Sequence, residues 1–323
     1  MRTVLVTGVA GFVGSHVAHR LLHAGDAVVG VDNFNAYYDP ALKEHRISSL
    51  EPLPGFTLVR MDFADAEGMS RVVREHGIRH VVHLGAQAGV RYSLEKPFEY
   101  EKSNLAGHLS VLEACRHAPD FEHLVYASSS SVYGHRPASG VAFRESDRVD
   151  EPVSLYAATK RACELISSTY GHLYGIPQSG LRFFTVYGPA GRPDMAYYSF
   201  TQKILRGEPI EIFGEGNMER DFTYIDDVVD GVVGVLDRPP ERGVNNILNI
   251  GNDRPERLLD FVRHIEEAVG REARMILRPM QPGDVVATWA DITKIRALIG
   301  YEPKTTLATG LPKFVEWYRS YAR

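Results

Sequence analysis

The chain has 323 residues, with 36 basic against 41 acidic side chains and a formal net charge of −5. Its length predicts about two domains, or one large domain with a lobe, and its 44% hydrophobic content suits a buried core rather than disorder. A mildly acidic chain is a poor candidate for a sequence-general nucleic-acid binder. The sequence contains no apolar run of the ~18 residues typical of a membrane-spanning helix. We therefore expect neither nucleic acid nor a membrane as a partner.

Cysteine usage and the N-terminus bear on the cellular compartment. Cys115 and Cys163 are the two cysteines of the chain, too few for a disulfide framework or, by themselves, for a zinc site. We expect both to be small buried side chains, and we expect no metal. The strand-like run from Met1 to Val6 lacks the apolar region and cleavage site of a signal peptide. These features predict a cytoplasmic protein.

Strand and helix patterns alternate along the first 130 residues. Apolar, β-branched runs predict strands over 3–7, 27–32, 57–60, 80–84 and 124–128, and helices are expected over 11–24, 66–76 and 98–117, with a loop and a helix over 34–50. Near-continuous apolar strands separated by helices predict a parallel sheet that is covered on both faces. With right-handed crossovers, the expected fold is α/β, a Rossmann-type doubly wound sheet.

The pattern changes beyond about residue 180, where Pro and Gly become frequent and short helices alternate with loops. This change predicts a smaller α/β lobe that binds substrate, formed mainly by residues 181–323. The first domain is expected over residues 1–180, and later segments at about 224–250 and 285–300 are expected to return to it.

The first predicted strand leads into three glycines, Gly8, Gly11 and Gly14, spaced G-x-x-G-x-x-G at the start of a helix. Gly8 would allow the tight turn, Gly11 would let the backbone approach a pyrophosphate, and Gly14 would let the helix pack on the strand. The pyrophosphate would then lie at a helix N-terminus, where free N–H groups and the dipole favour an anion. A glycine triplet alone can also be a purely structural turn.

Asp32 ends the second predicted strand, 24 residues after Gly8. A carboxylate there can accept hydrogen bonds from both ribose hydroxyls and would repel a 2′-phosphate, which favours NAD over NADP. Asp62, at the end of the third strand, is either an adenine contact or a turn residue. The remaining predicted NAD contacts flank these motifs or follow the fourth strand: Phe12, Val13, Asn33, Phe63, Leu84, Ala86 and Gln87.

Tyr156 and Lys160 are four residues apart and would share one helix face. An ammonium near a phenol, together with the positive nicotinamide, favours the phenolate, which makes Tyr156 a candidate base for a substrate hydroxyl. A Tyr-x-x-x-Lys pair alone is more often a surface pair. Here the hydroxyl cluster 128–131 follows a strand, at the edge that faces the cofactor crevice in this fold.

The glycine triplet, residues 128–134 and the Tyr156/Lys160 pair, in this order, resemble the extended short-chain dehydrogenase/reductase family over nearly the whole chain. The resemblance implies that Ser129 is the catalytic hydroxyl, Tyr156 the acid/base and Lys160 a ligand of the nicotinamide ribose. It implies that Asn104 is the Asn that lies near the catalytic Lys. It also implies a homodimer through helices near 98–117 and 154–174.

Members of this family bind nucleotide-diphospho-sugars, and the C-terminal half contains similar segments. Arg220, within 214–227, is similar to an Arg that contacts the nucleotide diphosphate, and Arg278 with Asp284 resembles the segment that holds nucleotide ribose and phosphate. The planar fork of Arg matches two phosphate oxygens, although a single Arg is more often a solvated surface group.

Residues 32–40, 87–93 and 182–195 resemble the UDP-glucuronate 4-epimerases of this family. This implies epimerisation at C4 to UDP-galacturonate through a transient 4-keto sugar, with NAD tightly bound and regenerated in each turnover. Ser130, Ser131, Thr185 and Arg192 would then hold the C6 carboxylate. The sequence departs from the pattern in two places, because Gly85 replaces a usual Ala and Ala190 a usual Trp.

Several alternatives remain. Family dehydratases carry acidic residues where Ser130 and Ser131 stand, and decarboxylases carry a Glu where Ser131 stands, so both reactions are disfavoured, the second more mildly. A UDP-glucuronate decarboxylase and a 4-epimerase of a neutral UDP-hexose stay open. A noncatalytic NAD sensor is disfavoured, because such a protein would not need the intact Ser129, Tyr156 and Lys160. A nucleic-acid-binding module would need a basic face.

Overall fold

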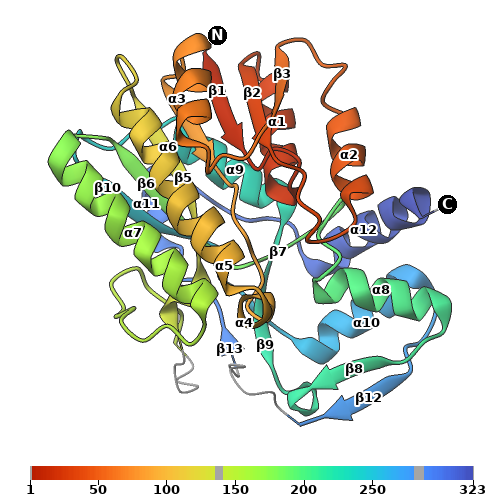
Figure 1. Cartoon of the computed structure of the whole chain (residues 1–323). Helices are drawn as coiled ribbons and strands as arrows, with labels where there is room; N and C mark the ends of the chain where they lie inside the picture. The colour runs from red at the N-terminus through yellow and green to blue at the C-terminus, as the bar shows by residue number, and fades with distance from the viewer. Residues whose placement is uncertain (1, 135–140, 280–286, 323) are drawn as a thin grey trace.

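A computed structural model describes residues 2–134, 141–279 and 287–322. A seven-stranded sheet with helices on both faces occupies one half of the molecule, and a smaller lobe lies beyond its carboxyl edge (Figure 1). The expected Asp284 lies outside the described residues. Within the described ranges, none of the helices combines the length and the apolar character needed to cross a membrane.

The large sheet confirms the doubly wound fold. It is formed by β1 (Thr3–Thr7), β2 (Ala27–Asp32), β3 (Phe56–Arg60), β4 (His80–His83), β5 (His123–Ser129), β6 (Gln178–Phe183) and β10 (Asn245–Ile250). The strand order is β10-β6-β5-β4-β1-β2-β3, and the paired strands run parallel. The order reverses between β1 and β4, and ligands in such sheets bind in the crevice at this point.

Two layers of helices cover the sheet (Figure 1). One layer contains α3 (Ala66–Glu75), α6 (Gly107–Arg116) and α7 (Leu155–Tyr174), and the other contains α1 (Phe12–His23), α9 (Ile225–Leu236) and α11 (Thr293–Ile299). The alternation of side chains along β1 explains both contacts, because Val4 and Val6 pack in one core cluster and Leu5 packs in the other. The strands are therefore apolar on both faces, as the sequence indicates.

The helix expected over 98–117 is divided. Pro97 begins the short helix α5 (Pro97–Tyr100), a π-helical turn follows over Glu101–Ala106, and α6 then continues. The wider turn contains Asn104, whose backbone oxygen accepts a hydrogen bond from the Cys163 thiol at 3.1 Å. A π-helical turn does not change the apolar periodicity enough to be seen in the sequence, and such turns are frequent at functional sites.

The lobe consists of short elements. Strand β9 (Glu219–Tyr224) pairs with β7 (Thr185–Tyr187), β11 (Pro255–Arg257) and β13 (Ala287–Thr288), and β8 (Ile210–Phe213) pairs with β12 (Met275–Arg278). Helices α8 (Ala196–Arg206), α10 (Leu258–Val269) and α12 (Leu307–Tyr321) pack around them. The other short elements are α2 (Pro40–Ser48), α4 (Tyr92–Glu95) and the 3₁₀ turns Ser130–Tyr133 and Gly214–Gly216.

Two later segments were expected to return to the first domain. Within 224–250, helix α9 and strand β10 lie against or within the large sheet. In the described part of 285–300, α11 packs on α9 and β10, whereas β13 pairs with β9 of the lobe. The exact domain boundaries stay a prediction, since residue 180 itself falls inside β6.

Candidate active site

A cavity lies where the strand order reverses, and segments from both halves of the chain line it. Among the predicted site residues, those that line it are Gly8, Gly11, Phe12, Val13, Gly14, Asp32, Asn33, Phe63, Leu84, Ala86, Gln87, Ser129, Tyr156, Lys160 and Arg192. The predicted glycine turn, hydroxyl, phenol and ammonium thus share one cavity with Arg192.

The glycine turn fits a dinucleotide because its backbone is packed too closely for side chains. A Cβ on Gly14 would lie 2.1 Å from the carbonyl oxygen of Gly8, and Gly8 itself has a φ of +69°. Gly11 precedes α1 and offers no side chain to cap the first turn, which faces the cavity through Phe12 and Val13. This uncapped turn can donate its N–H groups to a pyrophosphate.

Asp32 is fixed by its own surroundings. One carboxylate oxygen accepts from the Ala10 N–H at 3.1 Å, and the other accepts from the Phe34 N–H at 2.8 Å. The Lys43 ammonium lies 3.5 Å from the second oxygen, and both side chains are only 7% exposed. The carboxylate stands at the end of β2, where a ribose would lie, and Lys43 adds a cation beside it.

The proposed catalytic groups come from the end of β5 and the first two turns of α7. Ser154 caps α7 by accepting from the Ala157 N–H at 3.1 Å, which starts the helix just before Tyr156. The Lys160 ammonium is buried and donates to the Ala127 carbonyl oxygen at 2.8 Å. The ring of Tyr156 packs edge-on against that of Tyr100, with centroids 6.1 Å apart.

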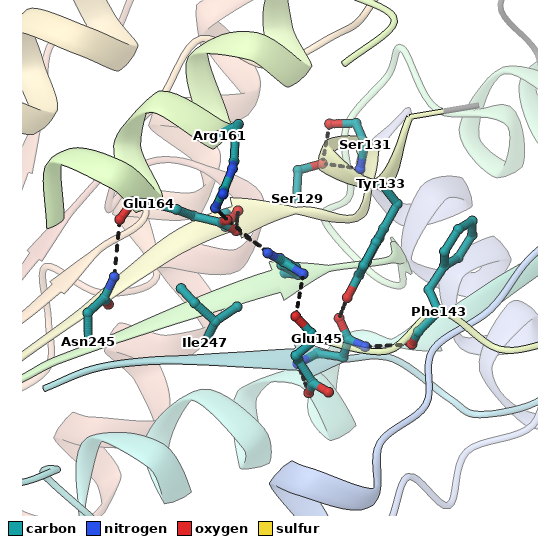
Figure 2. Close-up of polar contacts among 12 residues, drawn as sticks. Ser129, Ser131, Tyr133, Phe143, Glu145, Arg161, Glu164, Asn245 and Ile247 are labelled. Carbon is teal, nitrogen blue, oxygen red and sulfur yellow. Dashed lines mark hydrogen bonds and ion pairs between the residues drawn. The ribbon is translucent and has the colours of Figure 1, made fainter. Parts of the chain in front are cut away.

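The Ser129 hydroxyl is oriented by the turn that follows it. Its oxygen accepts from the Ser131 N–H at 3.2 Å and from the Ser131 hydroxyl at 2.9 Å (Figure 2). Since a hydroxyl oxygen has two lone pairs, its own hydrogen is the group that can reach a substrate oxygen. Ser129 is therefore suited to act as a donor.

Arg192 is paired within the cavity wall. Its guanidinium bonds both oxygens of Asp194, with Nε 3.0 Å from the first oxygen, and the Tyr37 hydroxyl donates to Asp194 at 3.2 Å. Burial alone would lower the pKa of Arg192, but Asp194 raises it above its usual range, so the guanidinium stays charged. Burial, and to a smaller extent the nearby Asp194, raises the pKa of Tyr37 to about 12. The hydroxyl therefore stays protonated and can donate.

The other predicted residues do not belong to the described cavity lining. Asp62 accepts from the Ala64 N–H at 3.0 Å and pairs with Lys102 at 2.8 Å. These contacts are those of a turn residue, one of its two interpretations. Asn104 lies one layer behind, where its side chain bonds both the N–H and the carbonyl oxygen of Gln87.

Three predicted substrate contacts lie on or near the lobe strands. Thr185 begins β7, between the lining residues Phe184 and Val186. Arg220, on β9, donates to the Glu219 carbonyl oxygen at 2.9 Å. Arg278 is an exposed residue at the end of β12, and it pairs with Glu211 on β8 at 2.9 Å. Ser130 and Ser131 form the 3₁₀ turn beside Ser129.

Beneath Ser129, the buried Glu164 of α7 connects two strands to the catalytic helix. Its carboxylate accepts from Ser128 at 2.6 Å and from Arg182 of β6 at 2.8 and 2.9 Å. Arg161 also reaches it from the same helix, as Figure 2 shows. Burial alone would raise the pKa of Glu164, but the bonds from Arg182, Ser128 and Arg161 lower it, so the carboxylate is ionised.

Sequence reasoning missed the polar residues of α2 and its preceding loop, Tyr38, Lys43 and Arg46. Asp39 caps α2 by accepting from the Ala41 N–H at 2.9 Å, and the helix then places Lys43 and Arg46 three residues apart on its inner side, where both are buried. The Asp-Pro start signal was readable in the sequence, but the burial of two cations was not.

The comparisons with known proteins agree with this geometry. Residues 4–251 match the NAD dependent epimerase/dehydratase family, so the chain belongs to that family, and the resemblance read from the sequence is confirmed. UDP-glucuronate 4-epimerase 1 of Arabidopsis thaliana is 49% identical over 333 residues, which cover 99% of this chain and 77% of the relative.

Solved structures are also similar. UDP-glucuronic acid 4-epimerase from Bacillus cereus, in complex with UDP-glucuronic acid and NAD, has a TM-score of 0.91 at 36% identity, covering 99% of each chain. The UDP-glucose 4-epimerase of Thermotoga maritima, solved with UDP-glucose, has a TM-score of 0.86 at 29% identity, covering 99% of this chain and 100% of that one.

The Glu164 network generates a stability prediction. Glu164→Gln leaves the buried Arg182 guanidinium without a counter-charge, and it should lower the free energy of unfolding by about 3–5 kcal/mol. Denaturant titration of the wild type and of the variant measures this loss. Glu44→Gln is the matched control, because Glu44 pairs with Arg60 at the surface, where both side chains are 50% exposed, and it should cost at most about 1 kcal/mol.

The difference in stability between the wild type and Glu164→Gln should depend on pH, with a known sign. The folded-state pKa of Glu164 is lowered, so its stabilising contribution is complete above the unfolded-state pKa and is lost as the pH falls through the folded-state value. Equal stability losses for the two variants at neutral pH would contradict the assigned role of Glu164.

Proposed function

We propose that this protein catalyses NAD-dependent epimerisation of UDP-glucuronate at C4, giving UDP-galacturonate through a 4-keto sugar. The observation that carries the proposal is that one cavity brings Ser129, Tyr156 and Lys160 together with the glycine turn and the partly buried cation Arg192. The similarity to UDP-glucuronate 4-epimerases over nearly the whole chain supports it.

Tyr156 and Ser129 are the residues proposed to act on the O4 hydroxyl of the sugar. Tyr156 takes the proton from O4 and later returns it, while the Ser129 hydroxyl donates to the same oxygen. Lys160 is anchored on the Ala127 carbonyl oxygen and lines the same cavity as Tyr156, one helical turn away on α7. The glycine turn and Asp32 would hold NAD in this cavity, where it would supply a hydride acceptor and donor for C4 of the sugar.

The carboxylate needs separate control because a 4-keto uronate is a β-keto acid that readily loses CO₂. Decarboxylation requires the C5–C6 bond to align with the carbonyl π-system. In the proposal, Arg192 with Ser130, Ser131 and Thr185 holds the carboxylate in a geometry that avoids this alignment and preserves its charge. Arg220, Arg278 and Asp284 are proposed for the nucleotide and diphosphate end.

A homodimer belongs to the same proposal. Large apolar side chains are exposed along α4–α6 and α7, which run side by side in Figure 1: Leu94, Phe98, Leu109, Leu155, Leu165 and Leu173. Several large apolar side chains exposed on neighbouring helices are typical of an interface. A cytoplasmic location is also proposed, and the free, buried thiols of Cys115 and Cys163 fit a reducing compartment.

Incubation with UDP-glucuronate and proton NMR tests the reaction. UDP-galacturonate is the expected product, whereas UDP-xylose or a 4-ketopentose would identify a decarboxylase, and conversion of UDP-glucose alone would identify a neutral-sugar epimerase. Tyr156→Phe should lower the turnover about 10²- to 10⁴-fold, because it removes the acid/base group. Near-normal epimerisation by this variant would eliminate Tyr156 as the base.

Arg192→Ala should weaken the binding of UDP-glucuronate while the affinity for UDP stays unchanged. The lost charge-assisted bonds are worth about 1.5–3 kcal/mol, or roughly 10- to 150-fold in the dissociation constant. Isothermal titration with both ligands measures the two affinities. An equal loss for UDP-glucuronate and UDP would remove Arg192 from the carboxylate site.

Charged side chains placed among the exposed apolar residues of α4–α6 and α7 should separate the subunits. Phe98→Glu combined with Leu165→Glu is expected to convert a dimer to a monomer in light scattering at micromolar concentration, because the interface would bury two carboxylates per subunit. Leu298→Glu is the control, since Leu298 is an exposed leucine on α11. A wild-type monomer would contradict the proposed dimer.

A further inference from the structure

Arg46 is a buried arginine whose charge is met by neutral oxygens. It lies on the inner side of α2 and is 2% exposed. Its Nη1 donates to the Ala10 carbonyl oxygen at 2.9 Å and to the Tyr38 hydroxyl at 2.6 Å. Its Nε and Nη2 donate to the carbonyl oxygens of Ala190 at 2.9 Å and Gly191 at 3.1 Å. One guanidinium therefore uses its planar fork to join two backbone segments and the Tyr38 side chain.

The segments that Arg46 joins belong to the two halves of the cavity. Ala10 lies within the glycine turn, and its N–H bonds Asp32. Ala190 and Gly191 directly precede Arg192, on a loop that departs from ordinary backbone geometry. Ala190 has a φ of +55°, in the left-handed region that a non-glycine residue seldom adopts. A conformation of this kind persists when neighbouring contacts hold it.

Helix α8 also holds the loop. The Arg192 N–H donates to the hydroxyl of the fully buried Tyr197 at 3.2 Å. A Cβ on Gly191 would lie 1.9 Å from that same hydroxyl, so the backbone lies directly on the ring. Arg46 and Tyr197 thus both hold residues 190–192, and Asp194 fixes the guanidinium of Arg192.

We propose that Arg46 is a positioning residue that determines specificity for the uronate. It holds the backbone of residues 190–192 in a strained conformation against the glycine turn, so that Arg192 projects to the place where the C6 carboxylate binds. This inference rests on the proposed function. Arg46 acts through backbone carbonyls, so its role does not depend on the side chain at position 190, where Ala replaces the Trp usual in similar sequences.

The chemistry of the contact requires arginine rather than any cation. The ammonium of a lysine is a point donor at a shorter reach, and it cannot present the fork that meets Ala10, Ala190 and Gly191 together. Arg46→Lys therefore keeps the charge and loosens the loop. A displacement of about 1 Å in a positioning group can lower a rate by about 10²-fold.

The test compares kcat/KM for UDP-glucuronate with that for UDP-glucose, and the affinity for UDP. Arg46→Lys should reduce the uronate preference by roughly 10- to 100-fold, with UDP affinity changed less than about twofold. Tyr38→Phe is the milder second variant, which removes one bond to Nη1 and should shift the preference in the same direction by roughly three- to tenfold. Arg20→Lys is the control, because Arg20 pairs with Asp230 at the surface.

Two readouts separate positioning from general destabilisation. Hydrogen exchange of peptides covering residues 188–195 should become faster in Arg46→Lys, with thermal unfolding recorded alongside. In the Arg192→Ala background, Arg46→Lys should change the preference by less than about twofold, because the side chain it positions is gone. A merely structural role would give the same loss in both backgrounds.

The outcomes distinguish the inference from the function on which it rests. Unchanged loop exchange in both Arg46→Lys and Tyr38→Phe overturns the clamp, and faster exchange with an unchanged uronate preference overturns its role in specificity. Either result leaves the proposed function standing if the wild type converts UDP-glucuronate. A wild type without that conversion overturns the proposed function and the uronate specificity together, while the exchange experiment still decides whether Arg46 holds the loop.

Discussion

The active site depends on a junction between α7 and the end of β5. Lys160 bonds the Ala127 carbonyl oxygen, and Glu164, one helical turn later, bonds the hydroxyl of the adjacent Ser128. Two consecutive strand residues are thereby attached to two consecutive turns of the helix. Ser129 follows at once on the strand, and Tyr156 lies one turn before Lys160. Proton transfer requires catalytic groups to be held to within a fraction of an ångström, which this double attachment supplies.

Net charge turns out to be the wrong scale for understanding the ligand. The chain carries −5 overall, but the positive charges near the cavity differ in how they are balanced. Arg182 is balanced by Glu164, and Arg192 is balanced by Asp194. Arg46 instead bonds four neutral oxygens behind the loop. A local cation of this kind dominates the field over a few ångströms, whatever the total charge of the protein.

The features that the sequence predicted are those encoded locally. The strands of the large sheet are apolar runs, the glycine turn is a fixed spacing, and Tyr156 and Lys160 are one helical turn apart, so each was readable from a short window. The charged residues of α2 were not predictable in this way. Arg46 is buried because it meets Ala190 and Gly191, 144 and 145 residues away in sequence, and no local pattern records such a contact.

The lobe shows where a motif and a side-chain contact give different information. The resemblance in sequence predicts Arg278 at a phosphate, and without a ligand its side chain bonds Glu211 across the β8–β12 pair. A motif identifies the segment, whereas the direction of a long side chain depends on the neighbouring charges that the fold brings to it. For the same reason Asp62 fits the turn interpretation, since Lys102 of the π-helical turn reaches its carboxylate.

Epimerisation places opposite demands on the two ends of the proposed substrate. The sugar must present both faces of C4 to the same cofactor, so the C6 carboxylate changes position during the reaction while the nucleotide stays bound. The short side chains of Ser130, Ser131 and Thr185 reach little beyond their backbone, which belongs to the 3₁₀ turn and to β7. Arg192 has a long side chain on a clamped backbone, and its fork already binds one carboxylate, that of Asp194. A base on a fixed helix and an arginine whose backbone is clamped suit a uronate that turns about a bound nucleotide.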